Sequence, residues 1–150
     1  MKIINASIED AQAILTIQKE AYLSEAQLND DFNIPPLTQT LCELEAQFGS
    51  KAILKIVINN KIVGSGQAQL NGVTCHIGRM AVLNEYKGQG IGSKLLSTLE
   101  GVYPQATRVE LFTGLKSEAN LTMYARRGYK QVRQELLGGT TVVFLEKILE

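Results

Sequence analysis

The sequence predicts an α+β fold in which a mixed, mostly antiparallel β-sheet is flanked by about four helices. The length of 150 residues fits a single domain over residues 1–150. Strand and helix patterns follow one another in the order β-α-α-β-β-β-α-β-α-β-β. Only two strand–helix–strand units occur, around Gly90 and Asn120, and only such units support parallel pairing. The other strands are therefore expected to pair antiparallel.

The N-terminal segment predicts a short strand and a first helix. Residues 2–5 (KIIN) form the strand. Ser7 followed by Asp10 has the spacing of a capping box, which marks a helix start. Apolar residues recur at near-helical spacing over residues 8–17, so the helix is expected to end near Tyr22.

The next segment predicts an interruption and a second helix. Residues 23–37 are polar and acidic and end close to two consecutive prolines, which indicates a loop or a broken helix. Thr40 and Glu43 form a second capping box. The helix that begins there is expected to end at Gly49.

The centre of the chain predicts three strands in sequence. Residues 52–58 and 61–70 flank Asn59–Asn60, which is typical of a tight hairpin turn. Residues 72–83 form the third strand.

The C-terminal half completes the pattern with two helices and three strands. Its predicted elements are a helix over 90–103, a strand over 108–113, a helix over 117–127, and an antiparallel pair over 129–136 and 141–148.

Composition excludes several classes of partner. Lys plus Arg equals Asp plus Glu at 15 each, so the strong positive field favoured by nucleic-acid binding is absent. No long apolar span or signal-type N-terminus occurs, which predicts a cytoplasmic protein without a membrane contact. Cys42 and Cys75 lie far apart and are expected to be buried reduced thiols. No metal cluster is visible.

A glycine-rich stretch precedes the helix over 90–103. Gly88, Gly90 and Gly92 alternate between Lys87 and Ser93, in a strand–loop–helix context. Free N–H groups and the helix dipole at such a helix start favour an anion, although a tight turn that binds nothing is the alternative. Ser93 stands where a P-loop needs Lys and where a dinucleotide-binding fingerprint needs its third glycine, so both of these loops are rejected.

Residues 82–96 (VLNEYKGQGIGSKLL) resemble the acetyl-CoA-binding motif of the GCN5-related N-acetyltransferase (GNAT) family, [QR]xxGx[GA]. The match runs from Lys87 to Gly92. Lys87 departs from the usual Arg or Gln, and it keeps the charge but not a planar fork. The second landmark, NLTMYARRGY, supplies Asn120, Tyr124 and a Gly-aromatic pair. The resemblance covers nearly the whole chain, and it implies a GNAT-like sheet with splayed parallel central strands.

The resemblance implies acetyl-CoA as the cofactor. Its pyrophosphate would lie on the glycine loop and the helix start. Its pantetheine arm would pair with strand backbone between the splayed strands, as peptides do in β-augmentation, while the side chains of Met80 and Val82 are expected to belong to the core. The implied cofactor-binding residues are Met80, Ala81, Val82, Lys87, Gly88, Gln89, Gly90, Ile91, Gly92, Ser93, Asn120 and Tyr124.

The resemblance also implies Tyr124 as the general acid that protonates the departing thiolate; a half-buried structural Tyr is the alternative. His76 is a candidate general base, because it lies six residues before Val82, where several family members carry a glutamate base. Strand alternation is expected to put His76 on the same side as Met80 and Val82. A structural His76 is the alternative. Glu110 is a second candidate base, expected rather to be solvated or ion-paired.

The implied function is N-acetyl transfer from acetyl-CoA to a primary amine of a small molecule. Transfer is expected to be direct, in a ternary complex, because Cys75 and His76 are strand neighbours that face opposite ways. A catalytically silent acyl-CoA-binding or sensing module and a peptide or protein N-acetyltransferase are the alternatives.

The acceptor is expected between the two early helices and the final strand pair. Glu20, Glu25, Asp30 and Asp31 could form an acidic rim for a cationic amine, or a solvated loop. The sequence leaves open the acceptor, the length of the acyl group, the base, and whether the strand over 141–148 presents an edge for a homodimer.

Overall fold

A computed structural model describes residues 1–150, and a single seven-stranded sheet runs through it in the order β1-β2-β3-β4-β5-β7-β6. The strands are β1 (Lys2–Asn5), β2 (Ala52–Ile58), β3 (Lys61–Asn71), β4 (Thr74–Val82), β5 (Arg108–Gly114), β6 (Lys130–Leu137) and β7 (Thr140–Ile148). The helices are α1 (Ala11–Asn29), α2 (Pro35–Thr38), α3 (Leu41–Gln47), α4 (Ile91–Glu100) and α5 (Glu118–Arg126), with short 3-10 turns η1 (Ile8–Asp10) and η2 (Asn84–Tyr86). The predicted mixed α+β class is confirmed.

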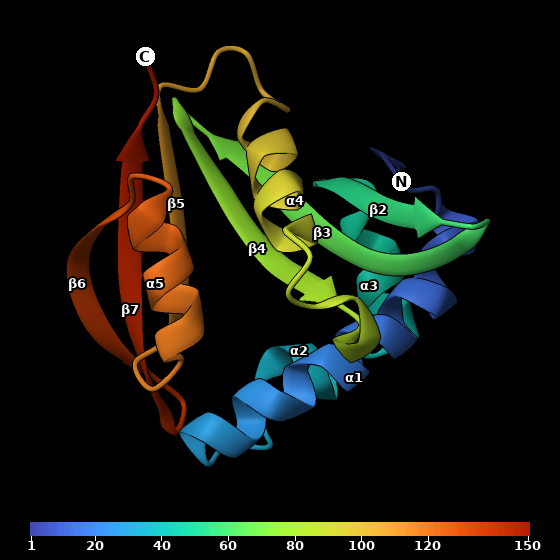
Figure 1. Ribbon diagram of the computed structural model, residues 1–150, viewed down its shortest axis with the longest axis horizontal. Coiled ribbons are helices and arrows are strands. Elements are labelled where there is room, and N and C mark those ends of the chain that lie inside the picture. Colours follow the sequence, from blue (N-terminus) through green and yellow to red (C-terminus); the bar gives the residue numbers. More distant parts are fainter.

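The sheet is divided by a gap between β4 and β5. These strands form the one parallel pair, and they pair only from Thr74–His76 to Arg108–Glu110. Beyond that point they diverge, and Figure 1 shows the two halves of the sheet opening like a V. The predicted splayed parallel central strands are confirmed. The facing edges of β4 and β5 thus carry backbone N–H and C=O groups that the other strand does not pair.

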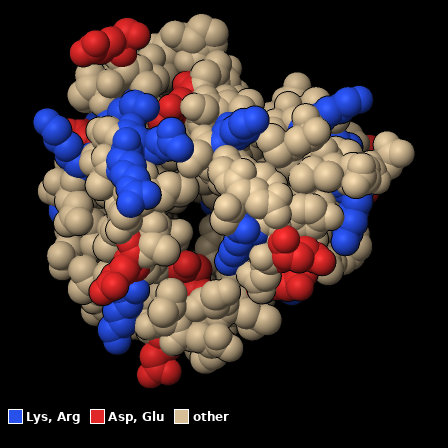
Figure 2. Space-filling view, in the orientation of Figure 1, with Lys and Arg blue, Asp and Glu red and all other residues tan.

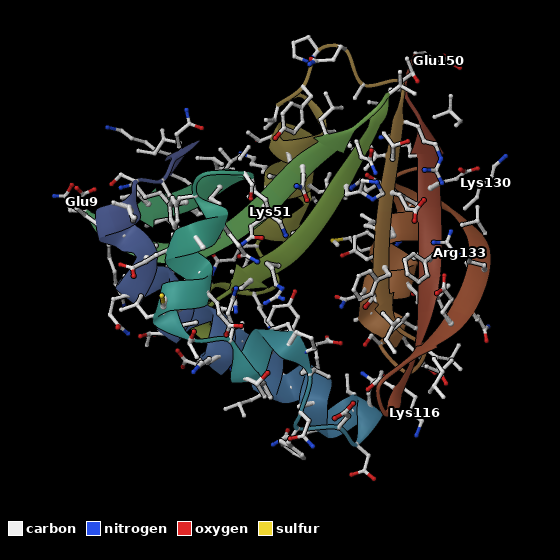
Figure 3. The ribbon with its side chains drawn as sticks, turned by 180° about the vertical axis from the view of Figure 1, so that it is seen from behind. Glu9, Lys51, Lys116, Lys130, Arg133 and Glu150 are labelled. Carbon is white, nitrogen blue, oxygen red and sulfur yellow. The ribbon has the colours of Figure 1, made fainter.

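Helices cover the two faces of the sheet differently. Helices α4 and α5 lie on one face, with α4 over β3 and β4 and α5 over β5 and β7, while α1, α2 and α3 lie behind the β1–β4 half (Figures 1 and 3). Helix α4 turns a buried apolar side, including Leu95 and Leu99, toward the sheet. An added Cβ at Gly66 would lie 2.8 Å from Leu99, so the absence of a side chain there lets α4 approach β3 closely.

Helix α1 is longer than predicted. It continues past Tyr22 to Asn29 and ends at Asp30, which has a left-handed backbone with φ 50°. The extension lacks an apolar stripe but buries Ala26 and hydrogen-bonds to Ser117, the N-cap of α5. The prediction that the helix ends near Tyr22 is therefore wrong, because the contacts that sustain it are tertiary.

In the rest of the chain, the predictions that depend on neighbouring residues are mostly confirmed. Both capping boxes form, and Asn59 and Asn60 both take positive φ in the predicted hairpin turn. The prolines of α2 occupy its first turn, where the missing N–H costs nothing. Cys75 is buried as predicted, whereas Cys42 is exposed because α3 buries only Leu44. No helix combines the length and apolar character needed to cross a membrane.

The unit around Asn120 does not give a parallel pair. Strand β7 lies between β5 and β6 and pairs antiparallel with both of them. The parallel pairing that this strand–helix–strand unit supported is therefore not realised, because the last strand inserts between the two. The edge of this half of the sheet is β6 and not the strand over 141–148.

A β-bulge interrupts β4 beside the gap. Arg79 has φ 53°, and Arg79 and Met80 together stand opposite the single residue Gly66 of β3. A bulge of this kind adds one residue to a strand and shifts the alternation of its side chains. A residue after the bulge therefore points to the face opposite to the one that simple alternation, counted from the residues before the bulge, would predict.

Candidate active site

The glycine loop lies at the start of α4, on the α4–α5 face of the gap. Gly88 and Gly90 have φ values of 79° and 77°, a left-handed conformation that glycine adopts without steric cost. Gly90 is the N-cap of α4 and has no side chain to cap the helix, so the first-turn N–H groups lack an intrahelical partner. Gly92 lies inside the helix, where an added Cβ would approach only Met123 Sδ, at 3.9 Å.

A polar pocket of about 270 Å³ lies next to this loop, between α4 and α5. It is lined by Ser93, Leu96, Ser97, Glu100, Arg126, Arg127 and Lys147. Lys147 is paired with Glu100 at 3.3 Å, but Arg126 and Arg127 are exposed and form no ion pair. Figure 2 shows Lys and Arg side chains over α5, beside a deep hollow between the two halves of the molecule. Two uncommitted cations and an uncapped helix start therefore meet on this side of the gap.

Tyr124 of α5 is buried, with 7% of its surface exposed, and its hydroxyl receives no hydrogen bond from another residue. Burial raises the pKa of Tyr124 above its ordinary value, and the neighbouring Tyr22 and Glu25 raise it further. The phenol is therefore neutral at pH 7 and keeps a proton to donate.

The extension of α1 brings Tyr22 and Glu25 to the same place. Burial raises the pKa of Tyr22 to about 12; the positive charge of Arg79 opposes this rise and the charge of Glu25 adds to it. Tyr22 therefore lies within electrostatic reach of Tyr124, Glu25 and Arg79, which come from three different elements.

Polar contacts from the end of α1 tie it to α5. Glu25 accepts hydrogen bonds from the Ser117 hydroxyl and, at 3.2 Å, from Asn120 Nδ2. Asn29 Nδ2 donates to Ser117 Oγ at 3.3 Å, and Asn29 packs so closely on Gly114 that no Cβ fits there.

A further contact reaches the β6–β7 turn, where the Thr140 hydroxyl donates to Asp31 Oδ2 at 2.6 Å. We call this set the α1 clasp: Glu25, Asn29 and Asp31 on the α1 side, and Ser117, Asn120 and Thr140 on the other. In Figure 1 the clasp lies at the open end of the V, where the end of α1 meets the start of α5 and the β6–β7 turn.

Comparison with known proteins identifies the family to which this chain belongs. The sequence profile described as the acetyltransferase (GNAT) family matches residues 11–129. The chain belongs to this family. The predicted family and enzyme class, an acetyl-CoA-dependent N-acetyltransferase, are confirmed.

Solved structures share the GNAT fold at low sequence identity. PaiA N-acetyltransferase from Thermoplasma acidophilum, in complex with coenzyme A, has a TM-score of 0.81 and 16% identity, covering 98% of each chain. YncA from Salmonella typhimurium with acetyl-CoA has a TM-score of 0.76 and 21% identity, covering 100% of this chain and 94% of that one. Ribosomal-protein-alanine N-acetyltransferase from Brucella melitensis has a TM-score of 0.73 and 18% identity, covering 99% and 100%. No curated protein sequence matches the chain.

The residues that the GNAT motif singled out flank the gap from both sides. The loop and helix start, from Lys87 to Ser93, lie on the α4 side. Asn120 and Tyr124 project from α5, and Met80, Ala81 and Val82 belong to the part of β4 that has left β5. Ala81 is buried, and the side chains of Met80 and Val82 pack against the core as expected.

His76 is not placed as predicted. It pairs with Glu110 where β4 and β5 are still joined, and its side chain is exposed. Its β3 partner is Gln69, whereas the partner of Val82 is Gly64; an odd separation of five puts the two pairs on opposite faces. The prediction that His76 shares a side with Val82 is wrong, because the bulge intervenes.

Glu110 is ion-paired, which was one of the expected alternatives. Burial opposes ionisation, but Arg108 at 2.7 Å and Arg133 at 3.0 Å outweigh it and hold the pKa of Glu110 below its ordinary value. Cys75 faces away from His76 and donates to the Leu99 carbonyl, and burial raises the pKa of its thiol to about 11. Neither group is suited to accept a proton from an amine or to carry an acyl group.

The prediction of an acidic rim or solvated loop over residues 20–31 also changes. Residues 20–29 are helical, so they do not form the solvated loop, and Glu25 and Asp31 already accept hydrogen bonds in the α1 clasp. A signal for these contacts was present in the sequence: Gln18, Tyr22, Glu25 and Asn29 recur at spacings of four, three and four, which marks one polar helix face. Such a stripe indicates a helix that makes buried polar contacts.

Proposed function

We propose that this enzyme transfers an acetyl group from acetyl-CoA to the primary amine of a small molecule, directly and in a ternary complex. The observation that carries the proposal is the position of the Tyr124 hydroxyl. Tyr124 is buried, makes no side-chain hydrogen bond, and lies within electrostatic reach of Tyr22 and Glu25.

The residues beside the gap fit coenzyme A. The left-handed glycines and the uncapped start of α4 suit a pyrophosphate, and the unpaired Arg126 and Arg127 suit a further phosphate. The free edge of β4 from Met80 to Val82 suits an amide-bearing arm, which would pair with it as an added strand. When bound, the thioester supplies an activated acyl carbonyl for the amine to attack.

Tyr124 would then act as the general acid. Its proton sits at the hydroxyl, and a thiolate with an unperturbed pKa near 8.5 is a base that a positioned phenol can protonate as it leaves. Glu110 is held ionised by two arginines and His76 faces away from Val82, so neither of the two candidate bases is retained. The amine is taken to react as the neutral form or to lose its proton to water.

The α1 clasp supports a small acceptor rather than a protein. It bridges α1 to the start of α5 and to the β6–β7 turn, and so bounds the acceptor side at the open end of the V. A folded protein would have to open these contacts before its amine reached Tyr124.

The test is thiol release from acetyl-CoA with a panel of small amines and short peptides, run alongside calorimetric binding of CoA. Amine-dependent thiol release with small acceptors is the expected result. Release with peptides alone would replace the small-molecule proposal with the peptide alternative. Failure to bind CoA would contradict the assignment of the cofactor residues.

A further inference from the structure

Arg79 is held at the bulge of β4 with a single neutral partner. Its Nη1 donates to Gln39 Oε1 at 3.1 Å, on the face covered by α1, α2 and α3. Gln39 is itself buried and also accepts a hydrogen bond from Gln18 Nε2 at 2.9 Å. The guanidinium has five N–H donors, so most of its hydrogen-bonding capacity is uncommitted.

No carboxylate balances the charge of Arg79. The six ion pairs of the protein all join other residues. Glu43 is the acid whose charge acts on Arg79, but its carboxylate accepts from the Thr40 backbone at 2.8 Å in the capping box and makes no ion pair. Arg79 is nonetheless partly buried, and a buried charge without a partner is costly.

A second cation lies beside it. Lys51 is also partly buried and unpaired; burial lowers the pKa of its ammonium, and the positive charge of Arg79 lowers it further. In Figure 3, Lys51 lies over the β3–β4 half of the sheet beside α3. Arg133 lies over the other half of the sheet and has two carboxylate partners, Glu110 and Glu135. On this face of the sheet, Arg79 and Lys51 therefore lack the carboxylate partners that Arg133 has.

A buried polar atom without a partner adds an independent observation. Gln67 is 3% exposed, and its Oε1 is the one buried side-chain polar atom that makes no hydrogen bond. Gln67 pairs directly with Gly78, the residue before Arg79, and so lies on the same face as Gly78. An added Cβ at Gly78 would meet nothing within 4 Å, so open space lies at Gly78 itself. Buried polar groups without a partner are rare in folded proteins, and a bound water, an ion or a catalytic role can account for them.

These groups are close to the proposed reaction centre. Arg79 directly precedes Met80, whose backbone lies on the free edge of β4. The charge of Arg79 acts on Tyr22, and Tyr22 in turn acts on Tyr124. A group held by Arg79 could therefore belong to the same small molecule as an amine presented at Tyr124.

We propose that Arg79, supported by Lys51, binds a carboxylate of the acceptor, so that the substrate is a small amino acid-like amine rather than a polyamine. This inference rests on the proposed function. A planar guanidinium binds a carboxylate through two parallel hydrogen bonds, and the carboxylate supplies the negative charge that Arg79 and Lys51 lack.

The test compares acceptors of equal length. Amino acids of two to six carbons with a terminal amine are each assayed against the n-alkylamine and the diamine of the same carbon count. For at least one length, the wild-type enzyme is expected to favour the amino acid over the alkylamine by roughly 10- to 100-fold in kcat/KM, the range for hydrogen bonds to charged groups. Arg79→Gln should remove this preference while changing the rate with the alkylamine less than about threefold.

Arg133→Gln is the matched control, because it removes an arginine on the same face that already has carboxylate partners. It should keep the preference for the amino acid. Thermal unfolding gives a second readout: Arg79→Gln should leave Tm unchanged or raise it, because it removes an unbalanced charge. A purely structural Arg79 would instead lower Tm, with an equal loss of activity toward all amines, and that result would overturn the inference.

Failure of the inference can be told apart from failure of the proposed function by calorimetry on the CoA-loaded protein. Transfer to alkylamines, diamines and amino acids without discrimination overturns the carboxylate site alone, and a preference for diamines does the same. Arg79-dependent binding of the amino acid without transfer to any amine overturns the proposed function and supports the site. Neither binding nor transfer overturns both.

Discussion

The two sides of the gap between β4 and β5 are built on different principles. On the α4–α5 side, the groups offered to a ligand are mostly backbone N–H groups of an exposed glycine loop and helix start, with Arg126 and Arg127 nearby. On the α1–α3 side, they are partly buried side chains, chiefly Tyr22 and Arg79, brought together by a long helix and a bulge. Backbone recognition depends on glycine spacing, which suits a ligand shared across a family. Side-chain recognition depends on the identity of single residues, which suits an acceptor specific to this chain.

Tyr124 belongs to both sides, and its removal should have the largest effect. Tyr124→Phe deletes the proposed proton donor but keeps the buried ring, so kcat should fall by roughly 10²- to 10⁴-fold. Calorimetric CoA binding and Tm should stay near the wild-type values. Thiol release and calorimetry measure the two quantities. Retention of wild-type kcat would show that proton donation comes from elsewhere.

The α1 clasp joins the two sides, and Asn120 is its contact on α5. Asn120→Ala removes the donor to both Glu25 and Thr113, which should cost about 2 kcal/mol of the free energy of unfolding because one acceptor is charged. Tm should then fall by about 4–8 °C. Thr122→Ala is the control, since Thr122 is exposed on the same helix and its replacement should be nearly neutral. Equal effects of the two variants on Tm would mean that the clasp does not hold the halves together.

Gly90 and Gly92 allow the effect of backbone conformation to be distinguished from the effect of side-chain space. Gly90→Ala puts a Cβ on a residue with φ 77°, which should cost about 1 kcal/mol in unfolding free energy and weaken CoA binding. Gly92→Ala should be neutral or stabilise by up to about 1 kcal/mol, because the position is helical and the added Cβ meets no close atom. Urea unfolding and CoA titration of both variants check this. The reverse order of the two variants would contradict the proposed role of the loop.

Replacement of Glu110 should have the smallest effect, and this effect on stability should be confined to acidic pH. The pKa of Glu110 is lower in the folded protein than in the unfolded chain, where it is near 4.5. The ion pairs of Glu110 therefore stabilise the folded state at pH values above about 4.5. This stabilisation is lost as the pH falls through the lower folded value. Glu110→Gln should therefore weaken the acid dependence of unfolding below about pH 4.5. It should leave the pH profile of kcat between pH 6 and 8 unchanged. Loss of the acidic limb of the profile, in which the rate rises with pH as a base loses its proton, would restore Glu110 as the general base.

The same contrast explains what could be predicted from the sequence. Turns, capping boxes and the glycine loop depend on neighbours along the chain, so Asn59–Asn60, Thr40 and Gly90 were correctly interpreted. The family motif carried the splay of β4 and β5. The bulge at Arg79 has no local signature of this kind, and it reversed the expected side of His76.

Contacts between residues distant in the sequence were the second feature that could not be predicted. The end of α1 depends on partners about ninety residues away, such as the Ser117 hydroxyl that Asn29 contacts. Insertion of β7 between β5 and β6 depends on which strands meet in space and not on their own patterns. The conformation of the glycine loop and the start of α4 was therefore predictable from the sequence, whereas the α1–α3 side was visible only as an unexplained polar stripe.

Amide hydrogen exchange with and without CoA tests most directly whether the gap holds the cofactor. CoA should slow exchange at the start of α4, over residues 91–93, and along the free edge of β4, over residues 80–82. Strand β6, which is remote from the gap, should be unchanged. Binding of CoA without protection at either of the first two segments would contradict the assignment of the gap as the cofactor site.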